Sequence, residues 1–301
     1  MVTDISVIGL GRMGMPISAV LAKAGYEVAA TDKRTEARED AVRCGALWRD
    51  SPADAAESTD VLITVLPGPE QVRAAMTGPD GALPALAPGA TWIDMTSNVP
   101  QAVEPVRDRA IGQGVLVLEA PAGGGPAAAR QGQLQLFIGG DAHVLDCNRP
   151  ILEVLADPVR IIHIGGYGTG YTAKLLVNLL WFGQAIATAE ALLIGQAAGI
   201  DLRVLQQALR GSPAATAFIT GDLDRLLRGD YLTTFGLDGI YDELEAVTAL
   251  AREHQLPSPL SDLVLQTYRR ALDRYGAVPG ELMGVALLEE EAARRLRAEG
   301  D

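Results

Sequence analysis

The sequence predicts an α/β protein, with an N-terminal Rossmann-type parallel-sheet domain followed by an all-α C-terminal domain and a long interdomain helix linking them. Three observations predict it. Short apolar runs alternate with helical segments up to residue 164, a glycine-rich turn follows the first of these runs, and only helical patterns occur from residue 165 onward. Strands that alternate with helices indicate right-handed βαβ units around a mainly parallel sheet. We therefore expect domains at 1–164 and 165–301.

The apolar runs of the first domain define its strands, and the amphipathic segments between them define its helices. Strands are expected at residues 5–9, 27–31, 61–66, 91–94, 115–119, 134–138 and 160–164, with a short extended piece at 45–47. Helices are expected at residues 13–24, 35–44, 52–57, 69–76 and 99–111.

The pattern of the second domain predicts helices that are separated by glycine and proline residues. They are expected at residues 171–198, 202–210, 221–228, 237–253, 259–275 and 282–298. The first is apolar enough to raise the question of a membrane span, but it carries Asn178, Gln184 and Glu190, which are costly in hydrocarbon. We expect a helix buried between domains or subunits, no membrane association, and a homodimer or homotetramer.

Composition excludes several classes of function. Of the 301 residues, 48% are hydrophobic and 21% are charged, and the formal net charge of −13 argues against a nucleic-acid partner. Cys44 and Cys147 lack the spacing of metal ligands, so we expect no metal site and reduced thiols. The N-terminus shows no signal-peptide pattern, which favours a cytoplasmic protein.

The glycine-rich turn is a GxGxxG motif after the first strand, formed by Gly9, Leu10, Gly11, Arg12, Met13 and Gly14. Gly9 permits the tight turn, Gly11 lets the backbone approach a pyrophosphate, and Gly14 lets the helix pack closely on the strand. The N-terminus of that helix supplies N–H groups for phosphate. The context therefore predicts a dinucleotide site for NAD or NADP.

The end of the second strand bears on the choice between the two nucleotides. Asp32 stands about 20 residues after the motif, where an acid accepts hydrogen bonds from the adenosine ribose. This favours NAD slightly. Lys33 and Arg34 follow directly and could accommodate the 2′-phosphate of NADP, or they could simply form a solvated helix start.

Further segments resemble the β-hydroxyacid dehydrogenases, a group of 3-hydroxyisobutyrate dehydrogenase type related to 6-phosphogluconate dehydrogenase. The resemblance covers nearly the whole chain. It rests on GLGRMGMPIS at 9–18, DMTSNVP at 94–100, EAPAGGGPAAARQGQL at 119–134, GTGYTAKLLVN at 168–178 and FGLDGIYDEL at 235–244.

The resemblance implies roles for individual residues. Leu66 and Pro67 would end a strand beside the cofactor, and Ser97 would lie near the nicotinamide ribose. The turn Gly123-Gly124-Gly125 would offer backbone N–H groups to an acid group of a small substrate. Lys174 would be the catalytic lysine, and Asn178 its orienting partner.

The spacing of the last pair fits these roles physically. Lys174 and Asn178 are four residues apart, so they share one face of a helix. An apolar helix disfavours the charged lysine, which can then donate a proton to a carbonyl oxygen as hydride arrives. The alternative is a lysine that extends to the surface beside a structural asparagine.

Two positions depart from the family pattern. Gly123 stands where the family usually has a serine that helps to hold the substrate carboxylate. An ungapped alignment places the family's Lys-Asp pair on Asp242-Glu243, which reverses a charge near the substrate. We expect a substrate with an amino group, a ring or an imine, contacted by Asp242 or Tyr241. Equally, Asp242 could face solvent, with Arg12 or Arg130 as substitute cations.

The leading interpretation is therefore an NAD(P)-dependent oxidoreductase that transfers hydride between a nicotinamide and a small hydroxy or carbonyl substrate. Two alternatives remain open. One is an imine reductase that acts on C=N bonds, a related fold whose members usually lack the lysine. The other is a non-catalytic cofactor-binding protein that uses the fold for interaction.

Overall fold

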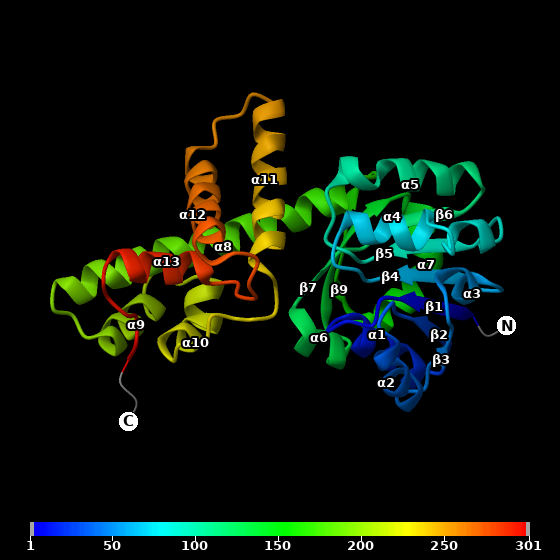
Figure 1. Cartoon of the computed structure of the whole chain (residues 1–301), viewed down its shortest axis with the longest axis horizontal. Coiled ribbons are helices and arrows are strands. Elements are labelled where there is room, and N and C mark those ends of the chain that lie inside the picture. Colours follow the sequence, from blue (N-terminus) through cyan, green and yellow to red (C-terminus); the bar gives the residue numbers. More distant parts are fainter. Residues whose placement is uncertain (1–2, 299–301) are drawn as a thin grey trace. The chain divides into compact units, whose positions relative to one another are not determined.

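A computed structural model of the chain describes residues 3–298. Contacts divide it into two compact units, Met1–Lys174 and Leu175–Asp301, so the division falls inside helix α8 (Thr169–Ala197). The predicted fold class is confirmed: the first unit contains a Rossmann-type sheet and the second is helical (Figure 1). The domain boundary after residue 164 stays a prediction.

The first unit is built on one sheet with strand order β3-β2-β1-β4-β5-β6-β8-β7, and β9 pairs with β8. Its strands are β1 (Asp4–Ile8), β2 (Glu27–Thr31), β3 (Leu47–Trp48), β4 (Val61–Thr64), β5 (Thr91–Asp94), β6 (Leu116–Glu119), β7 (Ala122–Gly123), β8 (Leu134–Gly140) and β9 (Ala156–Gly165). Strands β1 to β6 are parallel, whereas β8 runs antiparallel to β6 and β7. The strand order reverses at β1, so the carboxyl ends of β1 and β4 flank the crevice where such sheets bind ligands.

Helices cover both faces of this sheet (Figure 1). They are α1 (Gly14–Lys23), α2 (Arg38–Arg43) with a preceding 3₁₀ turn (Thr35–Ala37), α3 (Pro52–Ala56), α4 (Pro69–Thr77), a 3₁₀ turn (Leu83–Ala85), α5 (Pro100–Gly112), α6 (Gly125–Gln131) and α7 (Ala142–Leu155). Helices α1 and α7 bury one face around Ile17, Leu21 and Ile151. Helices α4 and α5 bury the other around Trp92 and Val103.

Two of these helices are absent from the sequence-based expectation. Helix α7 holds Pro150 in its interior, which weakens the helical signal, yet its apolar residues are buried and Asp141 caps it by accepting from the His143 N–H at 2.7 Å. Helix α6 follows Gly124, whose φ of 104° suits glycine, and has proline in its first turn. In both segments, the glycine or proline residues locally predict a break in the helix.

Up to residue 298, the second unit contains the rest of α8 and five further helices. They are α9 (Leu202–Arg210), α10 (Leu223–Leu227) after a π turn (Phe218–Asp222), α11 (Leu237–Glu253), α12 (Pro259–Tyr275) and α13 (Met283–Glu291). Helix α13 ends before the predicted residue 298. The chain folds back because Leu296 is buried and its N–H donates to the buried carboxylate of Glu289 at 2.7 Å.

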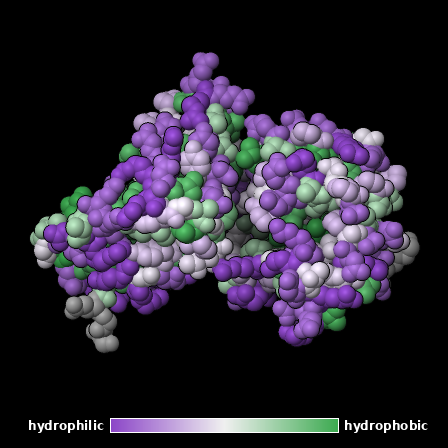
Figure 2. All heavy atoms as spheres, viewed as in Figure 1, coloured by the Kyte–Doolittle hydropathy of each residue, from purple (hydrophilic) through white to green (hydrophobic). Residues whose placement is uncertain are grey.

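Helix α8 is long and apolar enough to cross a membrane by length and composition alone, and a third of its most apolar window is buried. Its exposed apolar side chains include Leu180 and Ile194. Figure 2 shows hydrophobic surface at the end of the unit where α8 meets α9. Exposed apolar residues there include Ile200 and Val204.

Candidate active site

The glycine-rich turn joins β1 to α1 with a geometry that excludes larger residues at two positions. Gly9 has a φ of 97°, and a Cβ on it would lie 2.3 Å from the carbonyl oxygen of Val65. A Cβ on Gly14 would lie 1.8 Å from the carbonyl oxygen of Gly9. At Gly11 a Cβ would meet nothing within 4 Å. Strand, turn and helix therefore pack backbone to backbone, and the turn stays open at Gly11.

The N-terminus of α1 suits an anion. Its cap residue Met13 makes no side-chain hydrogen bond to the helix, and no acidic residue occupies the first turn. The first N–H groups of a helix lack intrahelical partners and carry the positive end of its dipole. Arg12 is exposed beside them. The residues present thus fit the pyrophosphate of a dinucleotide.

Asp32 lies beside this turn and is linked to it directly. The Leu10 N–H donates to Asp32 Oδ2 at 2.7 Å, and the Arg34 guanidinium donates to both carboxylate oxygens at 3.0 and 3.1 Å. Arg34 also donates to the Leu10 carbonyl oxygen at 3.1 Å. Burial alone would raise the pKa of Asp32, but the hydrogen bonds from Arg34 and Leu10 hold it below its ordinary value. Lys33 is exposed.

The ends of the next two strands are joined by a buried network around Asp94, the last residue of β5. Its carboxylate accepts from Thr64 Oγ1 at 2.7 Å, from Asn98 Nδ2 at 2.5 Å and from the Thr96 N–H at 3.1 Å. Asp94 is fully buried, and burial raises its pKa. The network fixes the chain on both sides of Ser97.

The same network orders the chain after β4. The Leu66 N–H donates to Thr96 Oγ1 at 3.1 Å, and a Cβ on Gly9 would lie 2.8 Å from Leu66 Cδ2. The predicted residue Leu66 therefore lies against the glycine-rich turn. Pro67, which follows it, is exposed, and Ser97 is half-buried.

Lys174 lies in the second turn of α8, and the first turn of that helix is anchored to the sheet. The Tyr171 hydroxyl donates to Asp94 Oδ2 at 2.7 Å, which ties α8 to the carboxyl end of β5. Burial and the nearby carboxylate of Asp94 raise the pKa of Tyr171 well above its ordinary value, so it stays a donor. Lys174, three residues further on, is half-buried.

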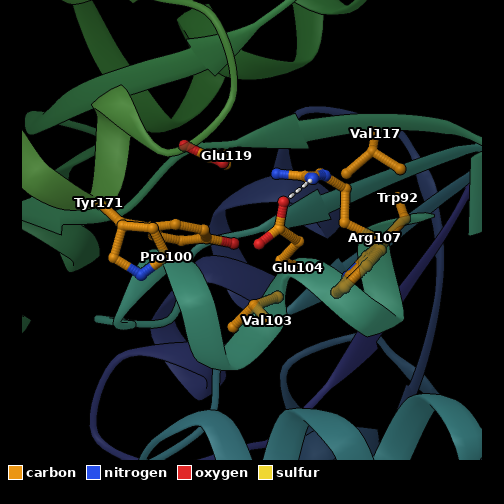
Figure 3. A pocket seen from close by; sticks show the side chains of 8 residues that line it. All are labelled: Trp92, Pro100, Val103, Glu104, Arg107, Val117, Glu119 and Tyr171. Carbon is orange, nitrogen blue, oxygen red and sulfur yellow. Dashed lines mark hydrogen bonds and ion pairs between the residues drawn. The ribbon is translucent and has the colours of Figure 1, made fainter.

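Glu119, the last residue of β6, lies beneath the same turn. The Gly168 N–H donates to its Oε1 at 2.5 Å. Glu119 and Tyr171 also line a small pocket between α5 and the sheet, together with Trp92, Pro100, Val103, Glu104, Arg107 and Val117 (Figure 3). None of the residues predicted to bind cofactor or substrate lines this pocket.

The predicted substrate turn lies at the start of α6. Gly123 is in β7, Gly124 precedes α6 and Gly125 begins it. A Cβ on Gly123 would have only ordinary contacts, the nearest at 3.5 Å from Phe137 Cε2. Packing alone therefore does not require glycine where the family usually has serine. Arg130, a candidate substitute cation, is exposed in the last turn of α6.

In the second unit, the partner of Asn178 is Glu243, which the alignment placed on the Asp of the family's Lys-Asp pair without assigning it a role. Asn178 Nδ2 donates to Glu243 Oε2 at 2.6 Å, which links α8 to α11, and Glu243 is only 8% exposed. Its neighbour Asp242 is exposed, yet partial desolvation and the nearby carboxylate of Asp238 raise the pKa of Asp242. The Tyr241 hydroxyl lies 3.3 Å from Glu245.

Three functional candidates thus went unassigned in the sequence: Asp94, Glu119 and Glu243. One signal was available for the first two. Each is an acid at the last position of a buried strand, and the carboxyl ends of parallel strands meet at the edge of the sheet where ligands bind. For Glu243 the signal was its alignment with the Asp of the family's Lys-Asp pair, and the packing of α11 on α8 brings it to Asn178.

Family models cover most of the chain. The NAD-binding domain of 6-phosphogluconate dehydrogenase matches residues 4–165. The model described as NAD-binding of NADP-dependent 3-hydroxyisobutyrate dehydrogenase matches residues 168–282. These matches include the glycine-rich turn and the helix that carries Lys174.

Relatives of known activity and solved structure agree. The chain is 36% identical to NAD-dependent L-serine dehydrogenase of Pseudomonas aeruginosa over 209 residues, which is 69% of this chain and 70% of that one. It is 30% identical to L-threonate dehydrogenase of Cupriavidus necator over 269 residues, or 89% and 90%. Its fold is similar to Mycobacterium tuberculosis 3-hydroxyisobutyrate dehydrogenase with L-serine, with a TM-score of 0.84, 27% identity and coverage of 95% and 99%.

Imine reductases are also among the similar folds. The enzyme of Myxococcus stipitatus in complex with NAD⁺ has a TM-score of 0.66 at 20% identity and covers 96% of this chain and 100% of that one, a likeness of fold alone. The family models and the more identical dehydrogenases decide the assignment. The chain belongs to the β-hydroxyacid dehydrogenases of 3-hydroxyisobutyrate dehydrogenase type, and it is an NAD(P)-dependent oxidoreductase that acts on CH–OH groups.

Proposed function

We propose that this enzyme interconverts a small β-hydroxy acid and its carbonyl form, with Lys174 as the acid/base. Residues 1–164 would hold the dinucleotide, and residues 165–301 would contribute to substrate binding and oligomerisation. One observation carries the proposal. The glycine-rich turn follows β1, while Tyr171 and Glu119 fasten the helix of Lys174 to the ends of β5 and β6, so both lie at the carboxyl edge of one sheet.

The residues that would hold the dinucleotide follow from this edge. The pyrophosphate would lie over residues 9–14, the adenosine ribose at Asp32, and the nicotinamide end beside Leu66, Pro67 and Ser97. When bound, the nicotinamide supplies or accepts the hydride. The open side of Gly11 and the uncapped start of α1 support this assignment.

The chain itself supplies the proton. In the reducing direction the Lys174 ammonium would donate to the developing alkoxide, and in the oxidising direction the neutral amine would accept the hydroxyl proton. Asn178 lies one helical turn later on α8, and its hydrogen bond to Glu243 fixes the side-chain amide. A fixed amide can orient the substrate or the lysine without reorganising during the reaction.

We propose that the substrate carries an amino group. By the resemblance, Gly123 lacks a hydroxyl and Asp242 replaces a cation at substrate-binding positions, so each change would favour an ammonium over a carboxylate. A Cβ on Gly123 would meet only ordinary contacts, so packing at Cβ does not require glycine there. Two similar proteins, a dehydrogenase named for L-serine and a 3-hydroxyisobutyrate dehydrogenase solved with L-serine, make L-serine the first substrate to try.

For the cofactor, we propose NAD in preference to NADP. The Asp32 carboxylate, whose pKa is held below its ordinary value, would lie beside the adenosine ribose and repel a 2′-phosphate, but Arg34 offsets part of its charge. Arg34→Ala should therefore weaken NADPH binding at least tenfold more than NADH binding, measured by fluorescence titration. Equal loss for both nucleotides would contradict this role for Arg34.

We also propose a cytoplasmic homodimer or homotetramer. Exposed apolar side chains on three helices of the second unit would be covered by a second copy. They are Leu176, Val177, Leu180, Ile194, Val204, Leu260 and Leu263. Sedimentation velocity tests the assembly, and a monomer at micromolar concentration would contradict it.

The decisive experiment measures steady-state kinetics with NAD⁺ and L-serine, L-3-hydroxyisobutyrate and L-threonate, and with NADH and a cyclic imine. Lys174→Ala should lower kcat by about 10²- to 10⁴-fold with every true substrate. Lys174→Arg keeps the charge without an easily lost proton and should be equally impaired. Lys23→Ala, at an exposed position of α1, is the matched control.

The outcomes separate the alternatives. Turnover of a hydroxy acid that disappears in both Lys174 variants supports the proposal. Turnover of the imine alone would assign the chain to C=N reduction. A non-catalytic role would be indicated if the protein binds cofactor but turns over no substrate, and if Lys174→Ala leaves the cofactor affinity unchanged.

A further inference from the structure

The first turn of α8 is packed on the sheet without intervening side chains. A Cβ on Gly170 would lie 2.6 Å from the Phe137 carbonyl oxygen and 2.7 Å from the Gly139 backbone nitrogen. A Cβ on Gly139 would lie 2.2 Å from Glu119 Oε2. Helix α8 and strand β8 therefore meet backbone to backbone, and the carboxyl group of Glu119 fills the space beside them.

Glu119 is 2% exposed, and its environment provides little to balance a charge. Oε1 accepts from the Gly168 N–H, while Oε2 has no hydrogen-bond partner among residues 3–298. Burial raises the pKa of Glu119 to about 7, and the backbone N–H groups of Gly168, Tyr171 and Gly170 oppose that rise only in part. A buried, incompletely partnered carboxyl group lowers the stability of the fold, so its presence indicates a role other than stabilisation.

The charged and titratable groups around Glu119 come from four elements. Strand β5 contributes Asp94, the register neighbour of Glu119 across the β5–β6 pair, which is also buried. Helix α5 contributes Arg107, which favours the ionised carboxylate but is already paired with Glu104 at 3.0 Å (Figure 3). The segment before α8 contributes Tyr167, whose ring lies 5.2 Å from the Arg107 guanidinium carbon. Helix α8 contributes Tyr171, which donates to Asp94. Arg107 is the one cation in this set. Among the described residues, the ion pairs of Arg107 are with Glu104 and Asp108, and Glu119 is not one of its partners.

We propose that Glu119 is a positioning residue for Lys174: its ionised carboxylate draws the N–H groups of the first turn of α8 onto the ends of β6 and β8. Lys174 lies one turn beyond this anchor, so a shift of the turn displaces its ammonium from the reacting oxygen. A displacement of about 1 Å can cost about 10²-fold in rate. Protonation of Glu119 weakens the anchor, because a neutral carboxyl is a poorer acceptor.

The inference rests on the proposed role of Lys174, and the test separates the two. Glu119→Gln keeps the shape and an acceptor oxygen but cannot ionise. Above about pH 7 it should lower kcat about tenfold or more, with KM and the Kd of NADH within about twofold of wild type. Below that pH the difference in kcat should narrow, since wild-type Glu119 is then also neutral. Glu119→Asp, which can ionise, should restore part of kcat at high pH.

Two further variants complete the design. Glu153→Gln makes the same chemical change at an exposed position of α7, away from α8 and from Arg107, and should leave kcat and its pH profile unchanged. Gly170→Ala should push the first turn off β8 and lower kcat while leaving the chemistry of the Glu119 carboxyl intact. It provides a second measurement if Glu119→Gln fails to fold.

Each result is decisive. A Glu119→Gln enzyme whose kcat stays within about twofold of wild type across the pH range would overturn the inference, as would a loss confined to cofactor Kd. If Glu119→Gln does not fold, wild-type kcat in Gly170→Ala would overturn it. If Lys174→Ala itself leaves kcat unchanged, the proposed function fails, whatever Glu119 does.

Discussion

The carboxyl group of Glu119 should make the stability of the first unit depend on pH. Its pKa is raised from 4.5 to about 7 in the folded chain, so the folded state holds a proton that the unfolded state has lost between those values. The free energy of unfolding therefore falls as pH rises through that window. The contribution from neutral Glu119 is fully present below the pKa of the unfolded state. A pKa raised from 4.5 to about 7 corresponds to about 3 kcal/mol of stability.

Glu119→Gln removes this titration. The variant should match wild type near about pH 4.5 and exceed its free energy of unfolding by about 3 kcal/mol near about pH 8.5. Urea unfolding at several pH values measures the difference in free energy of unfolding between the variant and wild type. The contributions of other titrating groups are common to both proteins and cancel in this difference. Of the three tryptophans, Trp181 lies in the second unit, so a Trp181→Phe background lets Trp48 and Trp92 report on the first. A difference that is independent of pH, or a Gln variant that is less stable at high pH, would refute the reasoning.

Three further predictions concern the packing around the site. Gly14→Ala places a methyl group 1.8 Å from the Gly9 carbonyl oxygen, and it should cost about 1–3 kcal/mol in urea unfolding and abolish NADH binding in a fluorescence titration. Tyr171→Phe leaves Asp94 without one of its donors and should cost about 1–3 kcal/mol in the same unfolding assay, with a lower kcat; unchanged values would mean that the hydroxyl does not anchor α8. Gly123→Ser should fold with unchanged stability, because its Cβ meets only ordinary contacts, and should lower KM for a simple hydroxy acid relative to L-serine; no change in that ratio would remove Gly123 from substrate selection.

Much of the first unit was predictable because its signals are local. Buried parallel strands appear as continuous apolar runs, and the glycine-rich turn has a fixed spacing. The helices that were missed, α6 and α7, carry glycine or proline where local rules place breaks. Their formation depends on burial against the sheet, which outweighs the local cost.

The candidate site divides in the same way. Gly9, Gly14, Asp32 and Lys174 could be identified from spacing and from resemblance to a family. The partner of Asn178 could not, because Glu243 is 65 residues away in the chain and comes into contact only through the packing of α11 on α8.

The sequence by itself determined the fold class and predicted the dinucleotide turn and the lysine, because these predictions depend on motifs whose residues are close in the chain. Only the tertiary structure decided how that lysine is held. The anchors Asp94 and Glu119 lie 77 and 49 residues from their partners on α8 and its preceding turn. Whether a buried carboxyl is costly or useful depends on the desolvation and the donors that the folded chain provides around it, and neither is encoded in local sequence.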